Sequence, residues 1–305
     1  MNEFELIAKI SKVLGKTSSR VRVGIGDDCL VAVPPKQNLI STIDSQVEGV
    51  HFNLKYTQPE DLGHKALAVN LSDIAAMGGK PLYALVSLGL PKKTGESFVL
   101  KMYRAMGKLA RKYHCDIAGG NISRSPNLFV DICIIGENKR PHLRNAGRVG
   151  DKIYLTGYPG LSACGLALLH KFGRKAEKQF PMAVKRHLRP EPRLAEAQKL
   201  GVHHSIGCMI DVSDGLSSEL HHLAKASGVK IEINLAKVPV HPELGKAAAL
   251  LKIDPRDWIF NGGEDYELLF SARQMTPRIS PWVTEIGVLK KGRGVNLLAR
   301  GFHHF

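Results

Sequence analysis

The sequence predicts a mixed α/β protein (α/β, or α+β) of two domains. Its 305 residues exceed the usual length of one domain, and a hydrophobic content of 44% allows each domain a core. Segments with helical and with extended apolar spacing occur in both halves. Both halves also place acidic residues where a predicted strand passes into a turn or helix. We expect domains at residues 1–146 and 147–305, divided near Gly147.

The first half contains helical and extended patterns. Apolar spacing and Gly or Pro punctuation predict these elements in order: helix 4–14, strand 21–23, strand 39–43 ending on Asp44, helix 62–77, strand 82–90, helix 98–113, and a short strand before Gly119. The second half follows the same logic, with strand 152–156, helix 161–171, a surface loop at 174–180, a strand at 209–210, helix 216–226, and strands 230–235 and 266–270.

The chain is strongly basic, with 43 Lys and Arg against 28 Asp and Glu and a net charge of +15. Such charge suits nucleic acid or anionic small molecules. The basic stretches are short and lack interleaved aromatic residues, which disfavours nucleic-acid binding. No apolar run approaches the ~18 residues of a membrane helix, and the N-terminus has acids where a signal peptide has basic residues, so we expect a cytoplasmic protein.

The five cysteines are widely spaced and form no CxxC pair. The spacing indicates neither a zinc site nor a disulfide framework, and we expect buried, reduced thiols.

Eight of the 28 acidic residues lie in five short segments: Gly24–Asp28, Thr42–Asp44, Asn70–Asp73, Asp211–Gly215 and Gly262–Asp265. Two like charges about 4 Å apart cost roughly 4 kcal/mol at an effective dielectric of 20. If these segments meet in space, protons or cations must therefore offset the repulsion. Hard carboxylate oxygens suit Mg²⁺.

Each acidic segment also has a purely structural interpretation. Asp27 and Asp28 could serve only as turn residues, and Asp211–Gly215 could be only a helix N-cap. Asp73 is different, because the predicted helix around it is apolar on most sides and places Asn70 one turn earlier on the same face. A largely buried helix should not carry an unpaired carboxylate, so a ligand role for Asp73 is favoured at least as much as a structural one.

Two segments imitate nucleotide-binding loops without matching them. Gly15-Lys16-Thr17 lacks the earlier P-loop glycine, where Ile10 stands, and Gly24-Ile25-Gly26 has Cys29 at the third glycine position of a dinucleotide fingerprint. Because acids repel phosphate, the second segment favours a nucleotide held through Mg²⁺.

Six segments in order resemble the family of ATP-using enzymes that includes aminoimidazole ribonucleotide synthetase, and among them the branch that phosphorylates thiamine monophosphate. They are Gly24–Asp28, Val47–Phe52, Lys65–Asp73, Lys185–Pro190, Asp211–Leu216 and Gly262–Leu268. The resemblance implies two domains, each a mixed sheet covered by helices, and a homodimer formed through the N-terminal halves. It also implies ATP and several Mg²⁺ ions in a cleft between elements of both domains.

The resemblance further implies roles for individual residues. The implied metal ligands are Asp28, Thr42, Asp44, Asp73, Asn121, Asp211 and Asp214. The implied ATP contacts are Gly120, Asn121, Arg144 and Ser213, and the implied substrate contacts are His51, Glu264 and Phe302. The implied reaction moves the γ-phosphoryl group of ATP directly to thiamine monophosphate. Since the acceptor is already an anionic phosphate, no catalytic base is expected.

The chain departs from the family pattern at Asn121, where that pattern has an Asp ligand. An Asn carbonyl brings no charge, so we expect an unusually high Mg²⁺ requirement. Two alternatives stay open. One is a sister enzyme that forms an amidine or selenophosphate, although selenophosphate synthesis calls for an early reactive Cys and the first here is Cys29. The other is a non-catalytic, basic nucleic-acid-binding protein.

Overall fold

A four-stranded sheet forms the centre of the first part of the chain in this computed structural model, which describes residues 2–201, 206–275 and 282–298. The chain divides into two units: unit 1 contains Met1–Ile74 and Gly79–Lys139, and unit 2 contains Ala75–Gly78 and Arg140–Phe305. Within the described ranges, no helix is both long and apolar enough to cross a membrane.

Unit 1 begins with a helix and a small hairpin, and then builds its main sheet. Its elements are α1 (Glu3–Leu14), β1 (Val21–Val23), β2 (Val31–Ala32), β3 (Asn38–Val47), α2 (Pro59–Ala76), β4 (Lys80–Leu90), α3 (Glu96–Lys112), β5 (Asp116–Arg124) and β6 (Phe129–Asn138). The main sheet has the order β3-β6-β4-β5, in which only the β4–β5 pair is parallel. Strands β3 and β5 are therefore its two edges.

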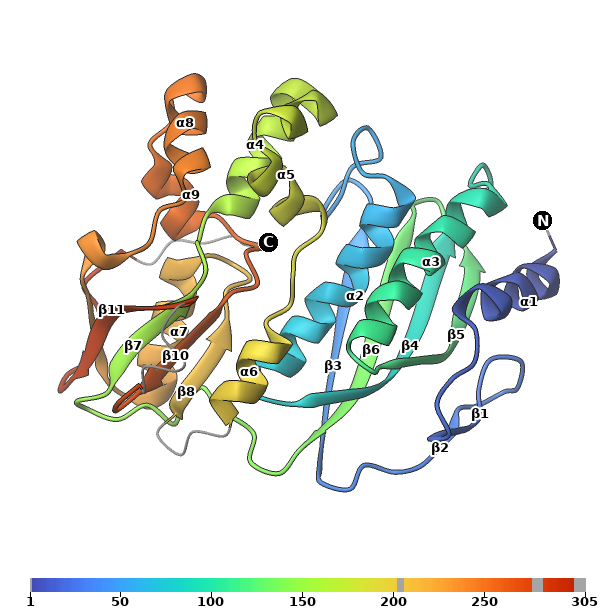
Figure 1. Cartoon of the computed structure of the whole chain (residues 1–305), viewed down its shortest axis with the longest axis horizontal. Coiled ribbons are helices and arrows are strands. Elements are labelled where there is room, and N and C mark those ends of the chain that lie inside the picture. Colours follow the sequence, from blue (N-terminus) through green and yellow to red (C-terminus); the bar gives the residue numbers. More distant parts are fainter. Residues whose placement is uncertain (1, 202–205, 276–281, 299–305) are drawn as a thin grey trace. The chain divides into compact units, whose positions relative to one another are not determined.

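One face of this sheet is covered by helices α2 and α3, as Figure 1 shows. The two helices approach closely at Gly63 of α2, where a Cβ would lie only 2.0 Å from the Met102 carbonyl oxygen of α3. Side chains on the covered face of β6, such as Ile132, are fully buried, as its alternating pattern requires. On the opposite face, Leu39 and Ile43 of β3 are 62% and 66% exposed. Within one copy of unit 1, that second face carries apolar side chains in contact with solvent.

Unit 2 is built on a six-stranded sheet with the order β12-β9-β11-β7-β10-β8, antiparallel except at the β12–β9 pair. Its strands are β7 (Lys152–Thr156), β8 (Ile206–Asp211), β9 (Lys230–Ile233), β10 (Leu268–Ala272), β11 (Val283–Lys290) and β12 (Gly294–Val295). Its helices are α4 (Leu161–Phe172), η1 (Gly173–Lys178), α5 (Pro181–Leu188), α6 (Leu194–Gly201), α7 (Leu216–Ser227), η2 (Leu235–Lys237), α8 (Pro242–Leu251) and α9 (Pro255–Asn261). Strand β10, between β7 and the edge strand β8, is buried along its whole length.

The mixed α/β prediction is confirmed, and the predicted strand 152–156 has the same bounds as β7. Several details are wrong. The short strand predicted before Gly119 is β5, which continues through Gly119 to Arg124 because it pairs with β4 over this length, and Cys133 of β6 is only half-buried. The strand predicted to end on Asp44 continues to Val47, because β6 pairs with it over its full length. The loop predicted at 174–180 is largely the 3₁₀ helix η1, and Phe180 is buried as a core side chain. Cys29 is exposed rather than buried, since it belongs to the acidic turn after β1.

Candidate active site

The glycine–aspartate segment Gly24–Asp28 follows β1 as a tight turn on the surface. Gly26 has φ +111°, a backbone conformation that L side chains rarely adopt. The Asp27 carboxylate accepts a hydrogen bond from the Asp28 amide at 2.8 Å. The Asp27 side chain thus stabilises the turn, as its structural interpretation predicted, and the exposed Asp28 side chain faces solvent.

A cavity of about 1060 Å³ lies beside this turn in unit 1. Its walls include Gly24–Asp28 and the Gly119–Asn121 stretch of β5. Gly120 has φ +151°, and a Cβ there would lie 1.8 Å from the Val86 carbonyl oxygen, so only glycine fits. The rest of the wall is mostly apolar, with Ile7, Ile10, Ile43, Leu85, Tyr103 and Ile135. The structure brings together Asp28, Gly120 and Asn121 at this cavity.

A second polar group lies between β3 and α2. Thr42 Oγ1 donates to Asp73 Oδ2 at 2.5 Å, and the Asp44 amide donates to Asn70 Oδ1 at 2.9 Å. Asn70 is fully buried, and its Nδ2 donates to the Ala66 carbonyl oxygen one turn earlier. The Asn70 and Asp73 face expected from the sequence thus meets Thr42 and Asp44 of the edge strand.

His51 follows β3 in a loop that is fixed from both sides. Its Nδ1 accepts a hydrogen bond from the Val47 amide at 3.2 Å, which leaves the ring hydrogen on Nε2. Lys65 of α2, only 2% exposed, donates from Nζ to the His51 carbonyl oxygen at 3.1 Å. A buried lysine needs such partners, so Lys65 ties this loop to α2.

The two polar groups of unit 1 lie at opposite edges of the sheet. Register pairs Ser45 with Asp131, Asp131 with Ser87, and Ser87 with Asn121. Ser45 of β3 and Asn121 of β5 are therefore the two ends of one row across the sheet. Three interstrand spacings, or roughly 14 Å, separate them. Mg²⁺ holds its ligands at about 2.1 Å, so one ion cannot bind both groups within a single copy of unit 1.

The oxygen donors themselves fit Mg²⁺: they are carboxylates, an amide carbonyl and a hydroxyl. However, few of these oxygen donors lie close to one another. Among the described residues there is no group of three or more His, Cys, Asp or Glu side chains placed to hold a metal ion. Each edge of the sheet offers part of a ligand set.

In unit 2, the segments Asp211–Gly215 and Gly262–Glu267 are joined by backbone hydrogen bonds. The Glu264 amide donates to the Ser213 carbonyl oxygen at 2.7 Å, and the Tyr266 amide donates to that of Val212 at 2.8 Å. Asp211, at the end of β8, is 3% exposed. The structure therefore brings Ser213, and with it Asp214, next to Glu264.

Glu219 of α7 is a site residue that the sequence did not reveal. It is 2% exposed, and its Oε1 accepts hydrogen bonds from the Asp214 amide at 3.1 Å and from Ser213 Oγ at 3.5 Å. Burial raises the pKa of Glu219 to about 7, although the positive charge of nearby Arg144 opposes the rise. The only signal in the sequence is an acid between the apolar Leu216 and Leu220 of a predicted helix. Glu219 positions the turn that carries Ser213 and Asp214.

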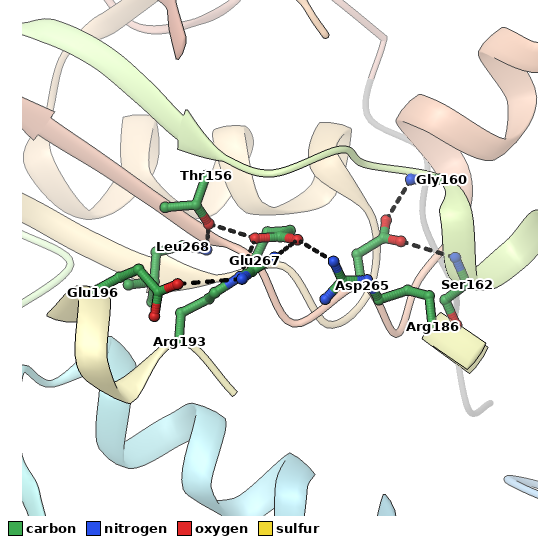
Figure 2. Close-up of polar contacts among 9 residues, drawn as sticks. All are labelled: Thr156, Gly160, Ser162, Arg186, Arg193, Glu196, Asp265, Glu267 and Leu268. Atoms are coloured by element: carbon green, nitrogen blue, oxygen red, sulfur yellow. Dashed lines mark hydrogen bonds and ion pairs between the residues drawn. The ribbon is translucent and has the colours of Figure 1, made fainter. Parts of the chain in front are cut away.

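Asp265 anchors the second of these segments to helix α4, as Figure 2 shows. Its side chain is fully buried and accepts hydrogen bonds from the backbone amides of Gly160, at 2.6 Å, and Ser162, at 3.1 Å. Burial raises the pKa of Asp265 to about 7, against the effect of these two amides. Asp265 thus satisfies amides at the N-terminus of α4.

Glu267 lies in a buried ion cluster, also drawn in Figure 2. Arg193 donates to both carboxylate oxygens, each at 2.6 Å, Thr156 Oγ1 donates at 2.6 Å, and Arg186 Nη2 lies 3.2 Å from Oε1. Burial alone would raise the pKa of Glu267, but the two arginines lower it below its usual range. The segment 262–267 is therefore held at its C-terminal end by a fully desolvated, charged carboxylate.

Glu264 is the half-buried acid of this segment. It has φ +65° and a side chain that is 25% exposed, and its Oε2 lies 3.3 Å from Nδ1 of the buried His187. The third predicted substrate residue, Phe302, lies outside the described residues.

Comparison with known proteins gives consistent results. The family model described as AIR synthase related protein, N-terminal domain, matches residues 26–138, and that for the C-terminal domain matches residues 148–275. The thiamine-monophosphate kinase of Bacillus subtilis (strain 168) is 42% identical over 88% of this chain and 82% of its own length. That of Aquifex aeolicus (strain VF5) is 36% identical over 100% of this chain and 98% of its own length.

A solved structure described as AaThiL complexed with AMPPCP and TMP has a TM-score of 0.84 to this chain. The two sequences are 36% identical, and the match covers 99% of this chain and 97% of that one. The similarity thus extends over both units.

Proposed function

Because the chain belongs to the AIR synthase related family, with thiamine-monophosphate kinases among its relatives, we propose that it phosphorylates thiamine monophosphate to thiamine diphosphate with ATP as co-substrate. The observation that carries this assignment is 42% identity to a thiamine-monophosphate kinase over 88% of the chain. The solved structure complexed with AMPPCP, an ATP analogue, and TMP has a TM-score of 0.84 to this chain and supports the same pair of substrates. We retain the division into domains 1–146 and 147–305 as part of the proposal.

The reaction requires in-line positioning more than proton transfer. The bond between the γ-phosphorus and the β,γ-bridging oxygen of ATP breaks, and a terminal oxygen of the acceptor phosphate forms the new bond. That oxygen is already anionic, so no general base is needed. Arg144 is proposed to neutralise phosphate charge at the nucleotide, and Gly120, Asn121 and Ser213 to contact it. Arg144 lies near Glu219, which holds the Ser213 turn, and this supports a common role for Arg144 and Ser213.

The proposed Mg²⁺ ligands are oxygen donors from both units: Asp28, Thr42, Asp44, Asp73, Asn121, Asp211 and Asp214. When bound, the metal would neutralise charge on the transferring phosphates. Thr42 Oγ1 is bonded to Asp73, and the Asp44 amide is bonded to Asn70 of α2, which supports Asp44, Asp73 and Thr42 as one part of the ligand set. His51 and Glu264 are proposed to bind the thiamine part, where a carboxylate suits a cationic thiazolium ring, and Phe302 to stack on it.

We also propose that the protein is a homodimer formed through unit 1. Two observations support this. The outer face of the main sheet carries Leu39 and Ile43 at 62% and 66% exposure, which favours apolar cover. The ligand groups lie at opposite edges of that sheet, and a second copy laid against it could bring its β5 edge near β3 of the first. An active monomer, measured by sedimentation during turnover, would overturn this part of the proposal.

The deciding experiment is an assay of purified protein with ATP, Mg²⁺ and thiamine monophosphate, with thiamine diphosphate measured by chromatography. Unphosphorylated thiamine serves as the control acceptor. Product from the monophosphate alone supports the assignment. Folded protein that gives no product over a wide range of Mg²⁺ concentration would overturn it.

A further inference from the structure

The backbone around Glu264 is fixed on both sides. Its own amide donates to the Ser213 carbonyl oxygen. The next residue in the chain, Asp265, accepts hydrogen bonds from the amides of Gly160 and Ser162, and Glu267 lies in the arginine cluster. A non-glycine residue at φ +65° costs free energy and persists only where neighbouring contacts impose it. These contacts therefore fix the point from which the Glu264 side chain extends.

His187 of α5 lies next to the Glu264 side chain. It is 3% exposed, and its Nδ1 lies 3.3 Å from Glu264 Oε2 and 3.2 Å from Ser162 Oγ. An ionised carboxylate can only accept hydrogen bonds, so a favourable contact with Oε2 requires the ring hydrogen to be on Nδ1. A hydroxyl can accept as well as donate, so Ser162 Oγ is compatible with the same tautomer.

Several contacts hold helix α5 in place and so keep His187 next to Glu264. Glu243 accepts hydrogen bonds from the first amides of α5, those of Met182 at 3.2 Å and Ala183 at 2.9 Å. Arg186, the neighbour of His187, is paired with the buried Glu267. A Cβ on Gly165 of α4 would lie 2.1 Å from the Ala183 carbonyl oxygen, so α4 and α5 are in close contact.

We propose that His187 is a positioning residue, which donates from Nδ1 to Glu264 and aims this carboxylate at the cationic part of the substrate. The inference rests on the proposed function, because it assigns the cation to the thiazolium ring of thiamine monophosphate. His187 is too buried to meet substrate, whereas the Glu264 side chain keeps 25% of its surface exposed. One carboxylate oxygen thus lies against a buried ring, while part of the same side chain lies at the surface.

The test compares three variants in steady-state kinetics: His187→Leu, His187→Asn and Glu264→Gln. Losing a hydrogen bond to a charged group should raise the KM for thiamine monophosphate roughly tenfold in His187→Leu, with the KM for ATP within about twofold of wild type. His187→Asn places an amide N–H near the Nδ1 position and should restore most of the loss. In the Glu264→Gln background, His187→Leu should add little, because the two residues act as a pair.

The matched control is His170→Leu, the same change at an exposed histidine of α4, which should leave both KM values unchanged. If His187→Leu shifts both KM values equally, or if Asn restores nothing, His187 has only a packing role. If the wild type does not phosphorylate thiamine monophosphate, the proposed function fails first. The hydrogen bond can then still be tested without substrate. In ¹⁵N spectra the His187 ring, identified by its loss in His187→Asn, should be protonated at Nδ1 and should shift in Glu264→Gln; protonation only at Nε2 would overturn the inference.

Discussion

Four acidic residues of the candidate site in unit 1 differ in environment from two acidic residues of the 262–267 segment in unit 2. In unit 1, Asp27 and Asp28 lie on an exposed turn, and Asp44 and Asp73 are half-buried beside hydroxyl and amide partners. In unit 2, Asp265 and Glu267 are fully buried and are held by backbone amides and arginines. A buried carboxylate of this second kind already has its partners, whereas an exposed one is open to a cation.

This difference separates two uses of one residue type. Neutralising a buried, paired carboxylate should cost stability, because it leaves the partner desolvated and unpaired. Neutralising an exposed carboxylate should cost little stability, and any loss then falls on the ligand that it binds. The predictions below test this contrast, from the largest expected effect to the smallest.

Glu267→Gln should give the largest effect, a loss of about 3–5 kcal/mol in the free energy of unfolding, because Arg186 and Arg193 would lose the carboxylate that they share. Urea denaturation followed by circular dichroism measures this. The matched control is Glu196→Gln, which removes a partly exposed partner of the same Arg193 and should cost less than about 1 kcal/mol. An equal loss of unfolding free energy in both variants would show that the buried cluster stabilises the protein no more than the partly exposed ion pair does.

Asp28→Asn should instead lower kcat roughly a hundredfold with almost no change in stability, since the side chain is exposed and is a proposed metal ligand. Steady-state assays at saturating ATP, together with thermal unfolding, separate the two quantities. Asp27→Asn is the control, because the Asn oxygen can still accept the Asp28 amide and keep the turn. Asp27→Asn proving as damaging as Asp28→Asn would mean that the turn, and not the Asp28 charge, is needed.

Asn121→Asp should lower the Mg²⁺ concentration for half-maximal activity several-fold, because a carboxylate attracts the ion more strongly than a neutral amide does. Asn121 lies at the cavity with Asp28, so the added charge falls near an existing one. A Mg²⁺ titration of both proteins tests this, and Asn127→Asp, an exposed change in the same unit, controls for general charge. No shift to lower Mg²⁺ in Asn121→Asp would show that position 121 does not set the Mg²⁺ requirement.

The contrast also marks what the sequence could predict. Exposed acids such as Asp28 stand in glycine-rich turns with a local signature, and Asp73 was conspicuous in an apolar helix. The roles of Glu219 and His187 depend on burial and on partners distant in sequence, which no local pattern records. Strand β6 does alternate buried and half-buried side chains, and this signal could have predicted it. That Asn121 and Thr42 lie at opposite sheet edges follows only from the strand order.

Asp265 and Glu267 provide the finest test, because their pKa values shift in opposite directions within one segment. The folded-state pKa of Asp265 is about 7, above its ordinary value of 3.8. Between these two values the folded state binds more protons than the unfolded state, so the contribution of Asp265 to stability is full below 3.8 and is lost as pH rises through 7. Glu267, whose pKa is lowered, behaves in the opposite sense: its contribution is present above its ordinary pKa of 4.5 and is lost as pH falls through the lowered value.

Asp265→Asn removes this titration while keeping the side-chain shape. The free energy of unfolding of the wild type, relative to this variant, should therefore fall by roughly 2 kcal/mol as pH rises from 5 to 7, and should level off at higher pH. Urea denaturation of both proteins across this range measures the difference. A relative stability that rises with pH instead would mean that the Gly160 and Ser162 amides outweigh burial and keep Asp265 ionised, which would make it a charged anchor like Glu267.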